Sequence, residues 1–338
     1  MKVDKSSMKR LIILTTHFGN NFSGGSTATH EIFVNIQHEF EEIIVICHTT
    51  GNHTFSNIIF KIYKNFWEAL RILSSLNDKH TLYYGDFYNS IWYVWSKKPF
   101  YFTYHDNWPE MANTSIKDLF RSLFYLPVYR SIFRNAKSVI VVSEHKKKYV
   151  ASYTKNVYLV RNGFTKKCMN KKNQNSSRNM ILMVGNIEKR KYKLAYKIFR
   201  KLNIDFSAEI HIYGNILDES LSQKLNSFNF VRIMGFQKSI PYQNYQCLLH
   251  ASLIENLPLS ICESLYHLTP VIAFDVGGIH EIVNETNGLL IRPFEINTMV
   301  TSLNDVLQKR IEFSFEKNDL SEYDWGLASE EYTKILMT

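Results

Sequence analysis

One stretch decides the fold of this chain: residues 248–293, with the sequence LLHASLIENLPLSICESLYHLTPVIAFDVGGIHEIVNETNGLLIRP. It predicts a short apolar strand at its start, a polar turn, a helix, and a second buried strand over 271–274. Gly277-Gly278 then predicts a turn that needs unusual backbone dihedrals. Strands and helices that alternate in this way indicate an α/β fold with a parallel sheet.

The helix of this stretch has recognisable boundaries. Asn256 is expected to be its N-cap, and Pro258 to lie in its first turn, where a missing N–H does no harm. Thr269-Pro270 should end it. Its core-facing side is predicted from apolar residues at helical spacing, which are Ile261, Leu265 and Leu268.

Two carboxylates frame the start of this helix, with Glu255 just before it and Glu263 about one turn in. A helix N-terminus suits a phosphate, because it offers N–H groups and the positive end of the dipole. The carboxylates would repel that phosphate, but they can accept hydrogen bonds from the hydroxyls of a sugar and a ribose on either side of it. The pattern therefore suggests a nucleotide-sugar. Two solvated glutamates on a surface helix are the alternative.

The larger pattern resembles the donor-site motif of retaining family-4 glycosyltransferases of the GT-B fold. The resemblance is carried by Glu255-Asn256-Leu257-Pro258 with Glu263, then Pro270-Val271-Ile272-Ala273, and then Gly277-Gly278 with Glu281. It implies two Rossmann-like α/β domains that face each other across a cleft, and transfer of a sugar with retention of its anomeric configuration. The residues expected to act in catalysis are Arg190, Lys191, Glu255 and His105. The residues expected to bind the donor are Gly24, Gly25, Gly185, Asn256, Leu257, Pro258, Leu259, Ser260 and Glu263.

Arg190 and Lys191 follow the first strand of the second half, where a doubly wound sheet places a phosphate-binding loop. They would neutralise the charge that builds on the leaving diphosphate. The run from Val184 to Lys191 resembles the family's loop, although Asn186 and Tyr192 replace residues common in it. The alternative is that both are ordinary solvated cations.

The first half offers a second set of candidates. Gly24-Gly25 opens a helix after the first strand, and His105 follows the strand over 100–104. By the resemblance, the glycine loop faces the donor phosphates and the histidine touches the donor sugar. A plain turn and a hydrogen-bonded surface histidine are the alternatives.

The chain has 338 residues and 45% hydrophobic content, which suggests about two domains. The resemblance implies an acceptor-binding domain over 1–165, a linker over 166–179, a nucleotide-sugar-binding domain over 180–320, and a C-terminal helical segment over 321–338 that crosses back to the first domain. No apolar run approaches a membrane span and no secretory signal is evident, so a cytoplasmic protein is expected. The cysteines show no paired or metal-binding spacing.

The formal charge of +9 suits nucleic acid, an anionic membrane or an anionic substrate. Residues 116–137 mix large apolar and basic side chains, which predicts either an interfacial helix or a core helix with its charges outside; Pro127 should kink or divide it. Lys146-Lys147-Lys148 is expected to form a basic helical face. Together they suggest peripheral association with the inner face of the membrane.

The function that the resemblance implies is transfer from a nucleotide-diphosphate-sugar to a hydroxyl of a glycan or lipid-linked acceptor, in bacterial surface polysaccharide or glycolipid synthesis. A UDP-sugar is the first expectation for the donor and a GDP-sugar the second. No permanently bound cofactor, no metal and no nucleic-acid partner are expected, since no Asp-X-Asp motif, metal-ligand cluster or nucleic-acid motif is found. The alternatives are a basic protein that binds nucleic acid or an anionic surface without catalysis, and a phosphorylase of GT-B-like fold.

Overall fold

The computed structural model describes residues 10–19, 22–76, 80–164, 179–202 and 208–337. The chain divides into two compact α/β units. The first unit comprises Met1–Gly163 together with Glu322–Thr338, and the second comprises Phe164–Ser321. Most of the predicted linker, 166–178, lies outside the described residues.

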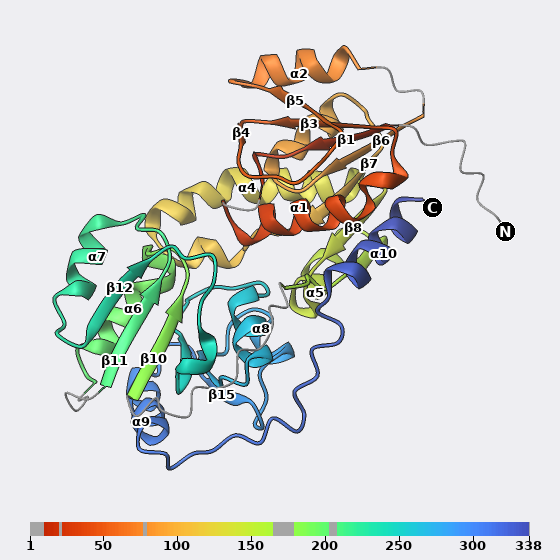
Figure 1. Cartoon of the computed structure of the whole chain (residues 1–338). Helices are drawn as coiled ribbons and strands as arrows, with labels where there is room; N and C mark the ends of the chain where they lie inside the picture. The colour runs from red at the N-terminus through yellow and green to blue at the C-terminus, as the bar shows by residue number, and fades with distance from the viewer. Residues whose placement is uncertain (1–9, 20–21, 77–79, 165–178, 203–207, 338) are drawn as a thin grey trace. The chain divides into compact units, whose positions relative to one another are not determined.

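The first unit is built on a parallel sheet (Figure 1), with seven strands among the described residues in the order β5-β3-β1-β6-β7-β8-β9. The strands are β1 (Arg10–Leu14), β3 (Glu42–Cys47), β5 (Ile58–Ile62), β6 (Thr81–Gly85), β7 (Phe100–Tyr104), β8 (Ser138–Val141) and β9 (Val157–Leu159). Two short strands, β2 (His17–Phe18) and β4 (Thr49–Thr50), pair beside it. The strand order reverses between β1 and β6, which is where sheets of this class bind ligands.

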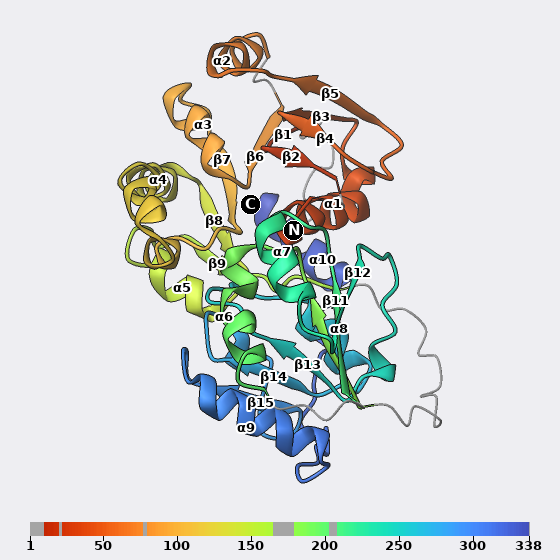
Figure 2. The same cartoon turned by 90° about the vertical axis from the view of Figure 1, so that its left-hand side faces the viewer.

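Helices cover both faces of this sheet, as Figure 2 shows. The helices are α1 (Gly24–Ile36), α2 (Phe66–Ser74), α3 (Ile91–Trp95), α4 (Ile116–Asn135) and α5 (Glu144–Val150). Alternate residues of β1 belong to two different apolar clusters: Leu11 packs with Phe33 of α1, and Ile12 packs with Phe133 of α4. This period-two division is what a parallel strand buried on both faces requires.

The end of the chain packs on the first unit. Helix α10 (Trp325–Leu336) begins at Asp324, whose side chain accepts hydrogen bonds from two backbone N–H groups of its first turn. It lies beside α1 (Figure 1), and Tyr332 OH is 2.8 Å from Thr103 Oγ1 of β7. The start of α10 packs closely against Gly163. A glycine is required there, since a Cβ on Gly163 would lie 2.3 Å from the backbone nitrogen of Trp325.

The second unit is also built on a parallel sheet, with six strands among the described residues in the order β12-β11-β10-β13-β14-β15. The strands are β10 (Asn179–Val184), β11 (Ala208–Tyr213), β12 (Val231–Gly235), β13 (Cys247–His250), β14 (Val271–Phe274) and β15 (Gly288–Ile291). The helices are α6 (Lys189–Phe199), α7 (Glu219–Asn226), α8 (Leu259–Tyr266) and α9 (Ile296–Leu307).

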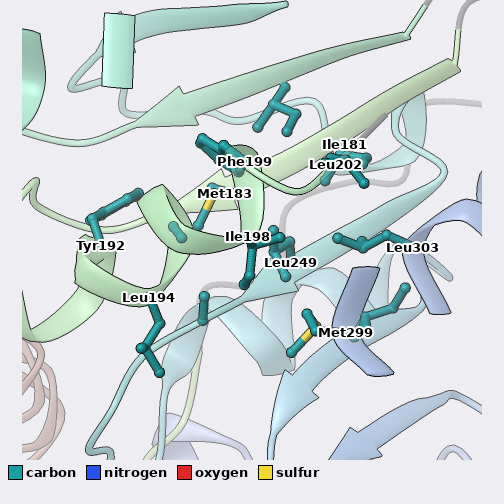
Figure 3. Packing of buried hydrophobic residues seen from close by; sticks show 14 of the residues in the cluster. Ile181, Met183, Tyr192, Leu194, Ile198, Phe199, Leu202, Leu249, Met299 and Leu303 are labelled. Carbon is teal, nitrogen blue, oxygen red and sulfur yellow. The ribbon is translucent and has the colours of Figure 1, made fainter. Parts of the chain in front are cut away.

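The core of the second unit joins α6, α7 and α9 to one face of the sheet. Figure 3 shows part of it, where Ile198 of α6 and Met299 of α9 pack close to Leu249 of β13. All three side chains are buried. This core anchors the strand that leads into the segment 251–258 and the helix that carries Arg190 and Lys191.

Several predicted helix boundaries are wrong. The N-cap of α8 is Pro258 rather than Asn256, and α6 begins at Lys189, so Arg190 and Lys191 lie in a helix where a loop was expected. The C=O of Asn256 accepts a hydrogen bond from the N–H of Gly278 at 2.9 Å, so the segment before α8 is tied to another loop. The side chain of Leu268 is 50% exposed because the helix ends at Tyr266 and Leu268 adopts a positive φ of 53°.

Helix α4 continues through Pro127, so that residue does not divide it. In the described part of the chain, no helix is long and apolar enough to span a bilayer.

Candidate functional site

The candidate site of the second unit is formed where β10, β13 and β14, neighbours in the sheet, reach their carboxyl ends. Gly185 follows β10, the segment 251–258 follows β13, and Gly277 lies in the turn after β14. Because the strands are parallel, three loops far apart in sequence meet at one edge, which is the edge that binds ligands in sheets of this class.

Glycine is required at two points of this edge. Gly277 has φ +60°, and a Cβ there would lie 1.7 Å from the backbone oxygen of Glu255. Gly185 has φ +139°, and a Cβ there would lie 3.0 Å from Nζ of Lys191. The loop after β14 therefore packs directly on the Glu255 turn, and the side chain of Lys191 lies against the loop after β10.

Arg190 and Lys191 belong to the first turn of α6 rather than to the preceding loop, as the corrected boundary implies. The guanidinium of Arg190 donates to Oε1 of Glu188 at 2.6 Å, and the C=O of Arg190 accepts from the N–H of Leu253 at 3.1 Å. The second bond ties the start of α6 to the segment that carries Glu255. Both basic side chains are about one quarter exposed, so neither is an ordinary solvated cation.

Glu255 is buried next to these cations. Its Oε1 atom is 3.9 Å from Nζ of Lys191 and 3.2 Å from Nε2 of His250. Burial alone would raise the pKa of the Glu255 carboxyl, but Lys191, His250 and Arg190 lower it further than burial raises it. The net pKa lies well below the ordinary value, so the carboxylate is ionised at neutral pH and accepts hydrogen bonds.

Glu263 lies on the second turn of α8. The buried hydroxyl of Tyr242 donates to its Oε2 atom at 2.5 Å. The residues between the two glutamates line the start of the helix: Asn256, Leu257 and Pro258 are buried, and Leu259 and Ser260 are partly buried. No described side chain caps the N-terminus of α8, which is the condition under which its N–H groups can bind an anion.

In the first unit, Gly25 and His105 lie against each other. A Cβ on Gly25 would lie 3.0 Å from the Cβ of His105, so a larger residue would push the start of α1 away from the histidine. Nothing lies within 4 Å of a Cβ placed on Gly24. The helix itself starts with a capping box between Ser23 and Ser26.

His105 is not the hydrogen-bonded surface histidine of the alternative interpretation. Its Nε2 atom is buried, and no described residue bonds to it. Burial lowers the pKa of His105 to about 4, so the imidazole is neutral at pH 7. A buried polar atom without a protein partner is rare and is characteristic of sites that bind a ligand or an ordered water.

The surface predicted to dock on a membrane is only partly as expected. Lys146 does not belong to a basic face, because its ammonium is fully buried, where it donates to the C=O of Trp108 at 3.0 Å and pairs with Glu110. Lys147 is 40% exposed.

Helix α4 has exposed apolar residues on its N-terminal half, whereas Phe133 is fully buried. The exposed ones follow helical spacing along a single stripe: Ile116, Leu119, Phe120, Leu123 and Phe124. The interpretation of α4 as a core helix with only its charges outside is therefore wrong for this half.

Three residues of the site were missed by the sequence analysis. His250 and Tyr242 contact the two glutamates, and Tyr192 donates from its hydroxyl to the C=O of Gly185 at 3.0 Å. A histidine at the end of an apolar strand was the only sequence signal for His250. Among the described residues, no group of three or more His, Cys, Asp or Glu side chains could hold a metal ion.

Residues 164–323 match the family described as glycosyl transferases group 1, and this range is a little under half of the chain. No curated protein sequence matches the chain.

Solved structures are similar over nearly the full chain. Sucrose-phosphate synthase from Thermosynechococcus elongatus has a TM-score of 0.79 at 15% identity, covering 97% of this chain and 98% of that chain. Anabaena HepE in complex with UDP-glucose has a TM-score of 0.70 at 14% identity, covering 97% of both chains. WaaG, a glycosyltransferase involved in lipopolysaccharide biosynthesis, has a TM-score of 0.70 at 14% identity, covering 96% of this chain and 95% of that chain. The predicted fold class of two Rossmann-like domains is thereby confirmed: the chain has the GT-B fold, and residues 164–323 carry the sequence pattern of glycosyl transferases group 1.

Proposed function

We propose that this protein is a retaining glycosyltransferase that moves a hexose or N-acetylhexosamine from a nucleotide-diphosphate-sugar to a hydroxyl of a glycan or lipid-linked acceptor. The observation that carries the proposal is the assembly of Lys191 and Glu255, 64 residues apart in sequence, at one edge of the second sheet. A cation for a diphosphate and an ionised carboxylate for sugar hydroxyls are the two groups that such a donor requires.

Each part of the donor has a proposed place in the second unit. The diphosphate is bound by Arg190, Lys191 and the N-terminus of α8 at Leu259 and Ser260, whose positive charge and N–H groups oppose the charge that develops on the leaving group. This charge is supplied without a metal ion. Gly185 lets the diphosphate approach the backbone closely.

The sugar and the ribose lie on either side of the diphosphate in this proposal. Glu255 accepts hydrogen bonds from the transferred sugar, and Asn256, Leu257 and Pro258 shape the pocket around it. Glu263 accepts hydrogen bonds from the ribose hydroxyls. From the first unit, neutral His105 offers its buried Nε2 to the donor sugar, with Gly24 and Gly25 at the start of the neighbouring helix.

The reaction proposed is attack by the acceptor hydroxyl on the same face of the sugar from which the diphosphate departs. The acceptor oxygen forms the new bond to the anomeric carbon, the bond from that carbon to the diphosphate oxygen breaks, and the acceptor proton leaves with the nucleoside diphosphate. A UDP-sugar is the first candidate donor and a GDP-sugar the second. Similar structures support the first choice, because HepE was solved with UDP and with UDP-glucose.

A role in bacterial surface polysaccharide or glycolipid synthesis is supported by the description of WaaG as acting in lipopolysaccharide biosynthesis. We further propose that the protein is cytoplasmic and docks on the anionic inner face of the membrane through α4. The stripe from Ile116 to Phe124 would enter the interface, while Lys117, Arg121, Arg130 and Arg134 meet anionic headgroups. Asp118 is the only acidic residue in this helix.

A screen of nucleotide-sugars by thermal shift identifies the donor, because a ligand that binds only the folded state raises the melting temperature. Incubation of that donor with candidate acceptors should then release a nucleoside diphosphate and form a product with retained anomeric configuration. Release of sugar phosphate from a glycan and inorganic phosphate would indicate a phosphorylase instead. Salt-sensitive binding of nucleic acid without binding of any nucleotide-sugar would indicate the non-catalytic alternative.

A further inference from the structure

We propose that His250 and Tyr242 are positioning residues, each of which orients one of the two carboxylates of the donor site, so that recognition of the sugar and of the ribose can be altered separately. This inference rests on the proposed function, because it takes Glu255 as the sugar-binding and Glu263 as the ribose-binding carboxylate. Neither residue belongs to the motif that carries the family resemblance.

His250 is the last residue of β13, and its side chain is 4% exposed. Its Nε2 atom lies 3.2 Å from Oε1 of Glu255, the same oxygen that lies 3.9 Å from Nζ of Lys191. An ionised carboxylate can only accept, so Nε2 must carry the proton that it donates. Both contacts fall on Oε1, and together they determine the direction in which Oε2 of Glu255 points.

Tyr242 plays the corresponding part for Glu263 from a different element, the 3-10 turn η4 (Tyr242–Asn244). Its hydroxyl donates to Oε2 of Glu263 at 2.5 Å. Burial raises the pKa of the Tyr242 hydroxyl well above its ordinary value, so this group remains a donor at every working pH.

The ring of Tyr242 is itself held in place. It stacks on His267, with ring centroids 5.6 Å apart and an interplanar angle of 6°. The backbone C=O of Tyr242 accepts a hydrogen bond from Oγ1 of Thr269 at 2.8 Å. A donor fixed on both sides restricts the carboxylate it binds, which is how a second layer of side chains orients a binding group.

The two hydrogen bonds come from β13 and from η4, and among the described residues no hydrogen bond joins the side chains of His250 and Tyr242. Loss of the hydrogen bond to one glutamate should therefore leave the carboxylate of the other glutamate oriented. His250 should affect the affinity for the nucleotide-sugar but not for the free nucleoside diphosphate, which has no sugar for Glu255 to bind. Tyr242 should affect both ligands alike, because both contain the ribose.

The test compares the parent with His250→Gln, His250→Asn and Tyr242→Phe. The side-chain nitrogen of Gln can occupy the position of His Nε2, whereas that of Asn is one methylene too short, so the two amides differ in reach but not in charge. Dissociation constants for the donor identified by the thermal-shift screen and for its free nucleoside diphosphate are measured by calorimetry, and thermal unfolding establishes that each variant is folded.

We expect His250→Asn to weaken nucleotide-sugar binding about tenfold and nucleoside diphosphate binding less than about twofold, and His250→Gln to stay within about threefold of the parent for both ligands. Tyr242→Phe should weaken both ligands by the same factor, about fivefold. If His250→Asn does not fold, Tyr242→Phe still tests the inference. A change in the ratio of its affinities for the nucleotide-sugar and for the free nucleoside diphosphate, relative to the parent, would overturn it.

Equal effects of His250→Asn on both ligands, or no effect on either, would also overturn it. A parent protein that binds neither a nucleotide-sugar nor a nucleoside diphosphate contradicts the proposed function itself. The two failures are therefore distinguishable.

Discussion

Nζ of Lys191 lies 3.9 Å from Oε1 of Glu255, which brings the first turn of α6 into contact with the segment after β13. This contact joins the cation proposed for the diphosphate to the carboxylate proposed for the sugar. It also keeps Glu255 ionised although the residue is buried, because the positive charge offsets the cost of desolvation.

Replacement of Arg190 and Lys191 by Ala together should lower kcat by a factor of about 100 or more, because the charge they oppose is greatest in the transition state. The donor KM should change less. Steady-state kinetics measure both, with circular dichroism to show that the variant is folded. As a matched control, Lys189→Ala removes a neighbouring cation that is 82% exposed and should leave kcat near the parent value. Unchanged turnover in a folded double variant would exclude both residues from the site.

Glu263→Ala should weaken the binding of free nucleoside diphosphate by roughly 1.5–3 kcal/mol, the range for a hydrogen bond to a charged group. The physical reason is that the ribose loses its acceptor. Calorimetry on the variant and the parent gives the difference directly. Binding as tight as that of the parent would show that Glu263 does not hold the ribose.

Gly277→Ala should disrupt the site through the backbone. The added Cβ would lie 1.7 Å from the backbone oxygen of Glu255, and the φ of +60° is unfavourable for any L-residue with a side chain. We expect a loss of stability of about 2 kcal/mol or more, measured by urea unfolding, together with loss of donor binding. Gly235→Ala is the control, because it shares a positive φ but has no atom within 4 Å of its Cβ. Equal losses in the two variants would mean that the close approach to Glu255 has no effect.

Asp86, which directly follows β6, should make the stability of the protein dependent on pH. The side chain is 1% exposed and accepts a hydrogen bond from Thr29 at 2.7 Å, and burial raises its pKa to about 7. A carboxyl whose folded pKa is raised contributes stability that is complete below its unfolded pKa of about 4 and is lost as pH rises through 7. The folded state then binds more protons than the unfolded state over this window.

The free energy of unfolding of Asp86→Asn, relative to the parent, should therefore increase between pH 5 and pH 8 by about 1–3 kcal/mol. Asn keeps an acceptor for Thr29 but does not titrate. Urea unfolding at several pH values measures the difference, and subtraction of the parent removes the contribution of other groups. A difference that is constant with pH would show that Asp86 titrates at the same pH in the folded and unfolded states.

Membrane docking can be tested by co-sedimentation with vesicles. Replacing Phe120, Leu123 and Phe124 by Ser should reduce binding to anionic vesicles at least about tenfold, because burial of each large apolar side chain contributes about 1.5–3 kcal/mol. All three side chains are more than half exposed, so folding should be unaffected. Replacing Arg130 and Arg134 by Gln should instead lower binding mainly at low salt, since each cation near an anionic bilayer contributes about 1 kcal/mol. Equal binding of the parent to neutral and anionic vesicles would contradict the proposal.

The sequence by itself determined the alternation of strands and helices and the positions of the motif residues, because apolar runs form buried strands and glycines mark turns with positive φ. The GT-B fold class was predicted from the family resemblance that these motif residues carry. Gly277 and Glu255 could both be identified from the sequence. The sequence did not show that Gly277 lies against the backbone of Glu255.

Only the tertiary structure decided the environment of each side chain. Phe120 is exposed while Phe133 of the same helix is buried, and Lys146 is buried against Glu110 while Lys147 is 40% exposed. His250 and Tyr242 became parts of the site only through contacts with the two glutamates. Sequence patterns report the spacing of residues along one element, whereas burial, pairing and charge state depend on which other elements pack against it, and these contacts join residues that are far apart in the chain.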